Sequence, residues 1–238
     1  MTVLREGRWA ECDMLVDLWE RSSGGTYIDC GANIGMCSLQ ILMNTSARVL
    51  AIEPNPVARF YLESSVRRLP ESMRRRITVL PYAAGAAAST QPLFTQRGNL
   101  GNSVIGGPRR NHSNASDVPA RWVTHSTGYA SHAGEVEVRT LDSLVAGRGV
   151  RNIGLVKFDV EGFECKALEG GSAVMRHAQT VMAEADPGLL GLQGCSLKGL
   201  HGMLHGFGFN VTTARTRTEA VFVGRRGSNW RRRGSPFD

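Results

Sequence analysis

The sequence lacks any apolar run long enough to cross a membrane as a helix. No stretch of about 18 consecutive apolar residues occurs in the 238-residue chain. The first eight residues also lack the apolar centre of a secretory signal. These absences predict a cytoplasmic protein that has no membrane passage and no membrane partner. The length suits one domain with a single large core.

The sequence also lacks a close Cys-x-x-Cys pair. It has an odd number of cysteines, namely Cys12, Cys30, Cys37, Cys165 and Cys195. Most of them fall inside expected strands or helices, which indicates buried reduced thiols rather than a disulfide framework or a zinc site. His201 and His205 are four residues apart on an expected helix, but no third ligand is evident nearby, so we expect no metal.

A concentrated basic stripe of the kind that binds nucleic acid is missing as well. The formal net charge is +7, but the arginines are scattered in several clusters along the chain. The segment from Arg225 to Asp238 is expected to be a flexible basic tail, and it contains one aromatic residue, Trp230. A basic RNA-binding or non-catalytic protein therefore stays open as an alternative, without a recognised RNA module to support it.

The dinucleotide fingerprint Gly-x-Gly-x-x-Gly is absent from the first strand–turn–helix pattern. The segment from Thr26 to Leu39 predicts a short strand, a glycine turn and a helix that starts near Ile34. Between Gly31 and Gly35 it has Ala32 and Asn33, where a pyrophosphate would need a glycine. An NAD-dependent oxidoreductase therefore stays a less favoured alternative function. The exposed amides at the helix start still favour a polar cofactor.

A second buried strand, Val49 to Glu53, ends in a carboxylate. Glu53 follows the glycine turn by about 20 residues, where doubly wound folds place the acid that binds a ribose hydroxyl pair. The next segment, from Asn55 to about Leu69, is expected to be a helix with Pro56 in its first turn. We therefore expect Glu53 at the edge of the sheet that faces the ligand.

Four separated motifs occur in order along the chain, namely Asp29–Gly35, Ala51–Pro56, Thr140–Leu144, and Val156–Gly162 with Leu168–Gly171. Together they resemble the FkbM family of S-adenosylmethionine-dependent methyltransferases. The resemblance extends from about Thr26 to about Gly224. It implies a Rossmann-like class I methyltransferase fold of the α/β class, with a mostly parallel seven-stranded sheet, a C-terminal antiparallel hairpin and helices on both faces. It also implies that S-adenosylmethionine is the cofactor and that the reaction is O-methylation of a small-molecule or sugar-like hydroxyl.

The expected cofactor site combines the glycine turn, the second strand end and a small-residue wall that the family pattern places beside the adenine. Its residues are Asp29, Gly31, Ala32, Asn33, Gly35, Glu53, Pro54, Asn55, Ala83, Ala84 and Asp159. The carboxylate Glu53 would bind the ribose, and the cleft near Asp29 and Gly31 would take the methionine end. S-adenosylmethionine has no pyrophosphate, so the absence of a middle glycine does not count against it.

Three carboxylates follow expected strands at the ligand edge and are candidates for the general base. Asp159 ends the strand that begins at Ile153, Glu161 follows it, and Glu184 ends the strand that begins at Gln179. A charge at a helix start or a surface acid is the alternative explanation of the first two. A helix over about Glu164 to Arg176 should follow.

The middle of the chain departs from the alternation of strands and helices. Strands are expected at Pro92–Thr95 and Glu135–Arg139, with a mobile polar loop between about Gly106 and Gly134. Asn102 and Ser103, just before that loop, are candidates for substrate contact. Phe209–Thr212 and Ala220–Val223 should form the closing hairpin, so that residues 1–224 make one methyltransferase domain and residues 225–238 the tail.

Overall fold

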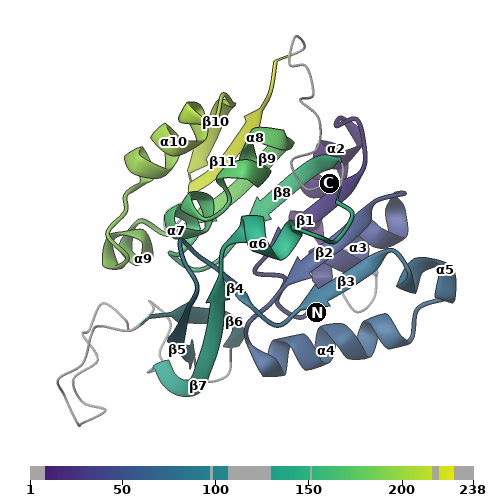
Figure 1. Ribbon diagram of the computed structural model, residues 1–238, viewed down its shortest axis with the longest axis horizontal. Helices are drawn as coiled ribbons and strands as arrows, with labels where there is room; N and C mark the ends of the chain where they lie inside the picture. The colour runs from purple at the N-terminus through teal and green to yellow at the C-terminus, as the bar shows by residue number, and fades with distance from the viewer. Residues whose placement is uncertain (1–8, 97–98, 107–129, 151, 216–219, 228–238) are drawn as a thin grey trace.

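The computed structural model describes residues 9–96, 99–106, 130–150, 152–215 and 220–227 (Figure 1). Its strands are β1 (Thr26–Cys30), β2 (Arg48–Ile52), β3 (Ile77–Leu80), β4 (Ala83–Ala84), β5 (Ser89–Gln96), β6 (Asn99–Ile105), β7 (Ala130–Arg139), β8 (Ile153–Phe158), β9 (Ala178–Ala185), β10 (Asn210–Arg215) and β11 (Ala220–Arg225). Its helices are α2 (Ala10–Glu20), α3 (Met36–Asn44), α4 (Pro56–Arg67), α5 (Glu71–Arg74), α6 (Leu141–Val145), α7 (Glu164–Glu169), α8 (Ser172–His177), α9 (Pro187–Leu192) and α10 (Leu197–Gly206).

The main sheet has seven strands in the order β10-β11-β9-β8-β1-β2-β3. All neighbours from β9 to β3 pair in parallel, and β11 pairs antiparallel with both β9 and β10. This confirms the predicted parallel sheet with an antiparallel hairpin at the C-terminal end. The chain runs outward from β1 to one side through β2 and β3 and to the other through β8 and β9. A ligand crevice is expected at such a switch point.

Successive residues of the central strands point to opposite faces of the sheet, and each face has its own core. On one face, Tyr27 and Val49 pack with residues of α2, α3 and α4. On the other, Ile28 and Leu50 pack with residues of α6, α7, α8 and α10. Strands that are buried on both faces read as continuous apolar runs. The prediction of helices on both faces is therefore confirmed.

A second sheet of four strands, in the order β4-β7-β5-β6, lies beside the main sheet (Figure 1). It contains the predicted strands of β5 and β7, whereas β6 was not predicted and residues 83–84 were expected to form a turn. The loop predicted between Gly106 and Gly134 is wrong at its end, because β7 already begins at Ala130 and pairs with β5. The tail predicted from Arg225 is wrong at its start, because Arg225 ends β11 and the Arg226 guanidinium donates hydrogen bonds to the carbonyl oxygens of Met175, Ala178 and Phe207. Residues 107–129 of the loop and residues 228–238 of the tail lie outside the described residues.

Two glycines move helix boundaries from their predicted positions. The predicted helix over residues 164–176 is two helices, α7 and α8, with a break at Gly170. A side chain at Gly170 would collide with the carbonyl oxygen of Gly85, since its Cβ would lie 1.9 Å away. The helix expected from Ile34 instead begins at Met36, because Gly35 takes a left-handed φ of 90° before it.

Four of the five cysteines form disulfides, which corrects the prediction of reduced thiols. Cys12 of α2 pairs with Cys37 of α3, and Cys165 of α7 pairs with Cys195 after α9. The Cα atoms are 5.0 and 6.4 Å apart, because helix packing joins positions that are remote in the sequence. Cys30 alone is free and buried.

Among the described residues, no helix is both long and apolar enough to cross a membrane. The Arg76 guanidinium donates hydrogen bonds to the carbonyl oxygens of Leu42, Thr45 and Ala47. It therefore fastens the end of α3 to the start of β3.

Candidate active site

A cleft opens where the carboxyl ends of β1, β2 and β8 meet, and β6 forms its opposite wall. Its volume is about 530 Å³, which includes space open to solvent. It is lined by Gly31, Asn33, Ile52, Glu53, Pro54, Tyr82, Ala83, Ala84, Ser103, Ile105, Asp159, Val160 and Glu161.

The glycine turn after β1 is shaped by a close approach of two backbones. Gly31 has a φ of 83°, and a Cβ there would lie 1.8 Å from the carbonyl oxygen of Asp159. Asn33 also takes a positive φ, of 52°, and its side-chain oxygen accepts a hydrogen bond from the backbone N–H of Ile34. These requirements explain why a glycine occupies position 31 and an asparagine position 33.

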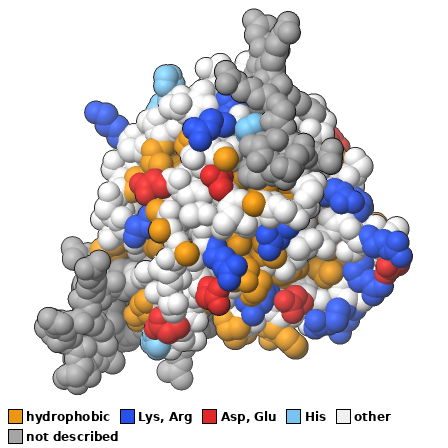
Figure 2. All heavy atoms as spheres, viewed as in Figure 1, with side chains coloured by type: hydrophobic (Ala, Val, Ile, Leu, Met, Phe, Trp, Pro, Cys, Tyr) orange, Lys and Arg blue, Asp and Glu red, His pale blue; other side chains and the backbone are white. Residues whose placement is uncertain are grey.

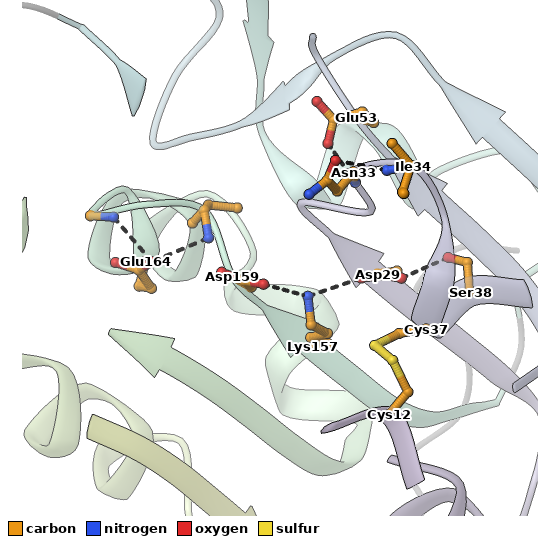
Figure 3. Close-up of polar contacts among 12 residues, drawn as sticks. Cys12, Asp29, Asn33, Ile34, Cys37, Ser38, Glu53, Lys157, Asp159 and Glu164 are labelled. Atoms are coloured by element: carbon orange, nitrogen blue, oxygen red, sulfur yellow. Dashed lines mark hydrogen bonds and ion pairs between the residues drawn. A yellow bond between two sulfur atoms is a disulfide. The ribbon is translucent and has the colours of Figure 1, made fainter. Parts of the chain in front are cut away.

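The Glu53 carboxylate is buried at the end of β2 and is held by two backbone amides, of which Figure 3 shows the one from Asn33. Asn33 N–H donates to Oε2 at 2.7 Å, and Asn55 N–H donates to Oε1 at 2.7 Å. Burial raises the pKa of Glu53 to about 7, although these two hydrogen bonds oppose the rise. Each carboxylate oxygen can accept a further bond, so a neighbouring pair of hydroxyls on a ligand in the cleft fits this group.

Behind the cleft, a lysine bridges two aspartates (Figure 3). Lys157 Nζ lies 2.9 Å from Asp159 Oδ2 and 3.6 Å from Asp29 Oδ1. Asp29 is fully buried and does not line the cleft, and its Oδ2 accepts a 2.6 Å hydrogen bond from the Ser38 hydroxyl. The Asp159 carboxylate is about one-third exposed and lines the cleft. A buried polar chain therefore runs from α3 through β1 and β8 to the cleft.

The charge states of Lys157 and Asp29 depend on their burial and on the opposite charges beside them. Burial works against the ammonium form of Lys157, but Asp159 and Asp29 outweigh it and raise the Lys157 pKa, with a further contribution from Glu184. Burial raises the pKa of Asp29, while Lys157 and Ser38 oppose that rise. We did not predict Lys157 as a site residue. Its signal was present, because a lysine inside an apolar strand needs a buried partner, and β8 pairs it in register with Asp29.

The loop after Asp159 is held by a buried glutamate. Glu161 has a left-handed φ of 52°, and Gly162 lies so close to Leu189 that a Cβ would be 2.7 Å from its backbone. Glu164 Oε1 accepts from the backbone N–H groups of Val160 and Gly162, both at 3.2 Å. Burial raises the pKa of Glu164 to about 7. This loop positions Val160 and Glu161 at the cleft.

The β6 wall is fastened to both sides of the cleft. The Asn55 side chain caps α4 and donates from Nδ2 to the Ser103 hydroxyl at 2.9 Å. Gln193 Nε2 donates to the carbonyl oxygen of Ile105 at 2.8 Å, and Lys166 in turn donates to Gln193 Oε1 at 2.7 Å. Ser103, one of the two predicted substrate contacts, thus lies in the cleft; the side chain of Asn102 is outside the described atoms.

The structure brings most of the predicted site residues to one cleft. Those that line it are Gly31, Asn33, Glu53, Pro54, Ala83, Ala84, Asp159 and Glu161. Those that do not are Asp29, Ala32, Gly35, Asn55 and Glu184. Ala32 is in the core, and Gly35 lies against Leu62 of α4, where a Cβ would be 2.2 Å from the leucine side chain. Within the described part of the chain, no group of three or more His, Cys, Asp or Glu side chains could hold a metal ion.

The sequence matches the family model described as the methyltransferase FkbM domain over residues 29–197. Hexuronic acid methyltransferase AglP of Haloferax volcanii is 26% identical over 163 residues, which are 68% of this chain and 56% of that protein. The chain thus spans little more than half the length of this curated relative.

Solved structures show the same fold at low sequence identity. The crystal structure of methyltransferase FkbM from Methylobacillus flagellatus KT superposes with a TM-score of 0.53 at 18% identity, over 84% of this chain and 43% of that one. The TrmK protein of M. capricolum, solved with S-adenosylhomocysteine, superposes with a TM-score of 0.50 at 8% identity, over 93% of this chain and 70% of that one. These likenesses show the class I methyltransferase fold.

Proposed function

Because the chain belongs to the FkbM methyltransferase domain family, we propose that it transfers a methyl group from S-adenosylmethionine to a hydroxyl of a sugar-like acceptor. The observation that carries the proposal is the Glu53 carboxylate, which lines the cleft at the end of β2 and is fixed by two amides, one of them from the glycine turn. A carboxylate at this place in a doubly wound sheet suits a ribose hydroxyl pair.

The residues present fit this cofactor. Glu53 would accept hydrogen bonds from the ribose, and the small side chains of Ala83 and Ala84 leave room for the flat adenine beside the sheet edge. The backbone at Gly31, which lines the cleft, would meet the methionine end. Bound in the cleft, S-adenosylmethionine supplies an electrophilic methyl group. The remaining task of the protein is to place an acceptor hydroxyl and to take its proton.

Two carboxylates in the cleft support that task. Asp159 is held by Lys157 at one oxygen, which fixes its orientation, and Glu161 lines the same opening. We assign Asp159 to aligning the acceptor and Glu161 to accepting its proton. Glu184 lines no part of the cleft, and its charge acts on the buried Lys157. We therefore no longer place Glu184 among the catalytic residues.

A sugar acid is the acceptor class that best matches the surroundings. The similar protein AglP is a hexuronic acid methyltransferase. In this chain the Arg139 guanidinium lies 4.1 Å from the centre of the Tyr82 ring, and Tyr82 lines the cleft. A cation at this rim would attract a carboxylate on the acceptor, as arginine–carboxylate pairs do elsewhere. Glu137 also binds Arg139 at 2.9 Å, so it would compete with the acceptor.

Calorimetric titration and a methyl-transfer assay test the proposal together. The protein is titrated with S-adenosylhomocysteine and separately with NAD, and then assayed with methyl-labelled cofactor on glucuronic acid, glucuronides and glucose. We expect binding of S-adenosylhomocysteine, no comparable binding of NAD, and label on the sugar acids in preference to glucose. Binding of NAD alone would replace the proposal with an oxidoreductase.

A further inference from the structure

The solvent face of α4 is apolar over its first two turns. Three apolar residues lie at positions i, i+3 and i+4 of this face, namely Val57, Phe60 and Tyr61. Their exposed fractions are 48%, 58% and 51%, respectively. Their opposite neighbours, Ala58 and Leu62, are buried against the sheet. The two rings pack edge to face with centroids 5.7 Å apart, so they form one contiguous patch. Isolated exposed apolar residues are common, but three on one helix face are not.

The same face becomes basic over the last turn of α4. Arg67 follows Phe60 and Arg68 follows Tyr61 by seven residues, the helical spacing that keeps them on the same side, and both are exposed. From residue 57 to residue 75 the chain has five arginines and two glutamates, an excess of three positive charges. Figure 2 shows hydrophobic and basic side chains along the lower edge of the molecule, where α4 and α5 lie in Figure 1.

We infer that this face of α4, defined by Val57, Phe60, Tyr61, Arg67 and Arg68, binds an anionic lipid surface. Helices that lie in the membrane interface bury aromatic and aliphatic side chains at the level of the headgroups, while arginines meet the anionic lipids. Glu63 faces Arg59 and Arg67 at 3.5 and 3.8 Å, and it offsets only part of this charge.

A second copy of the chain fits the α4 face less well. The three apolar side chains, each about half exposed, present on the order of 300 Å², whereas a stable protein interface needs roughly 800 Å² from each partner. Shallow insertion into a lipid interface requires no such area. The arginines on the same face would also repel their copies in a symmetric dimer. The inference departs from the expectation of no membrane partner, which rested on the lack of a segment that could cross the bilayer; this surface points to peripheral binding.

The α4 face begins next to the cleft. Pro54 lines the cleft and Asn55 caps α4, so the helix starts directly after a cleft residue. The exposed Ile34 likewise follows the cleft residue Asn33. A lipid surface bound along α4 would therefore bring the cleft close to headgroup-level acceptors. The inference does not depend on the proposed methyl transfer, because binding to vesicles is measured without cofactor or acceptor.

Co-sedimentation of the whole protein with vesicles tests the inference. Vesicles of phosphatidylcholine and phosphatidylglycerol at 3:1 are compared with vesicles of phosphatidylcholine alone. We expect binding to the anionic vesicles only. Arg67→Gln/Arg68→Gln should weaken it by about 30-fold, because each basic residue near an anionic surface contributes about fivefold. Phe60→Ser/Tyr61→Ser should weaken it by at least about tenfold through loss of apolar insertion.

Matched control variants test whether vesicle binding depends on the α4 face or only on the protein's overall charge and exposed apolar surface. Arg21→Gln/Lys198→Gln removes two exposed cations elsewhere, and Met14→Ser removes an exposed apolar side chain elsewhere. Both should bind vesicles as the parent does, and S-adenosylhomocysteine binding should be equal in all variants. The inference is overturned if the parent ignores anionic vesicles, if the controls lose binding as much as the α4 variants, or if sedimentation velocity shows self-association that Phe60→Ser/Tyr61→Ser abolishes.

Discussion

Lys157 Nζ lies 2.9 Å from Asp159 Oδ2 and 3.6 Å from Asp29 Oδ1, so one buried ammonium connects the cleft to a carboxylate behind it. Only 7% of the lysine side chain and 1% of the Asp29 side chain are exposed. The pair cannot be broken without leaving a charge in the core. The relation gives Lys157 two separable roles, which are to neutralise Asp29 and to orient Asp159.

Lys157→Met should therefore destabilise the fold strongly. Removal of one partner of a buried ion pair typically costs about 3–5 kcal/mol, which urea unfolding would measure. The double variant Asp29→Asn/Lys157→Met removes both charges and should recover most of that stability. Turnover should stay low in the double variant, because Asp159 still lacks its anchor. Recovery of full turnover in a stable double variant would limit Lys157 to a structural role.

Asp159→Asn and Glu161→Gln should each lower turnover while the cofactor still binds. Loss of a general base typically lowers the rate by about 10²–10⁴-fold, and loss of an aligning group raises KM as well. We therefore expect the larger fall in kcat for Glu161→Gln and the larger rise in acceptor KM for Asp159→Asn. Glu169→Gln, at an exposed acid of α7, serves as the control. Parental kinetics in both variants would remove these residues from the reaction.

Glu164 should make the unliganded protein less stable as the pH rises. Its pKa is about 7 when folded and near 4.5 when unfolded, so the folded state holds the proton more tightly. The resulting stabilisation is fully present below pH 4.5 and is lost as the pH rises through 7. Glu164→Gln keeps the acceptor for Val160 and Gly162 without this titration. It should be more stable than the parent at pH 8, by on the order of 2 kcal/mol, and about equal at pH 4.5. Parallel stability curves for the two proteins would contradict this reading.

The two disulfides predict a definite count of reactive thiols. Without reductant, the denatured protein should show one free thiol, from Cys30, and after reduction it should show five. Reduction should also lower the melting temperature, because closing the 25-residue loop between Cys12 and Cys37 is worth roughly 3 kcal/mol in the chain-entropy model. Five free thiols before reduction would show that the cysteines are close but not bonded.

The main sheet and the Glu53 site could be predicted because their signals are local. A strand, a glycine turn and a helix follow one another within residues 26–44, and the acid that ends β2 comes at a recognisable distance. The alternation of apolar runs with helical segments then predicts a parallel sheet. These features need no knowledge of distant contacts.

The features that the sequence did not reveal depend on packing between remote segments. Strand β6 exists because it pairs with β5, and β4 because it pairs with the end of β7. The break at Gly170 follows from its approach to Gly85, and the disulfide partners are set by how helices pack. Glu184 ends a strand at the expected edge, but it lies outside the cleft lining.

Cofactor affinity should depend on pH through Glu53. Ribose hydroxyls donate to the ionised carboxylate, so protonation of a group with a pKa of about 7 removes an acceptor before the ligand arrives. The Kd for S-adenosylhomocysteine should therefore rise by about tenfold from pH 8 to pH 6. In Glu53→Gln the affinity should be lower throughout and nearly independent of pH in this range.

Calorimetric titration of S-adenosylhomocysteine into the parent and into Glu53→Ala at pH 8 tests the assignment of the cleft most directly. We expect a single site in the parent and an affinity lower by about 1.5–3 kcal/mol in the variant, the usual value of hydrogen bonds to a charged group. The variant should keep the parent's unfolding transition, so that the loss is not one of fold. Equal affinity in the two proteins, or heat from NAD and none from S-adenosylhomocysteine, would contradict the placement of the cofactor at Glu53.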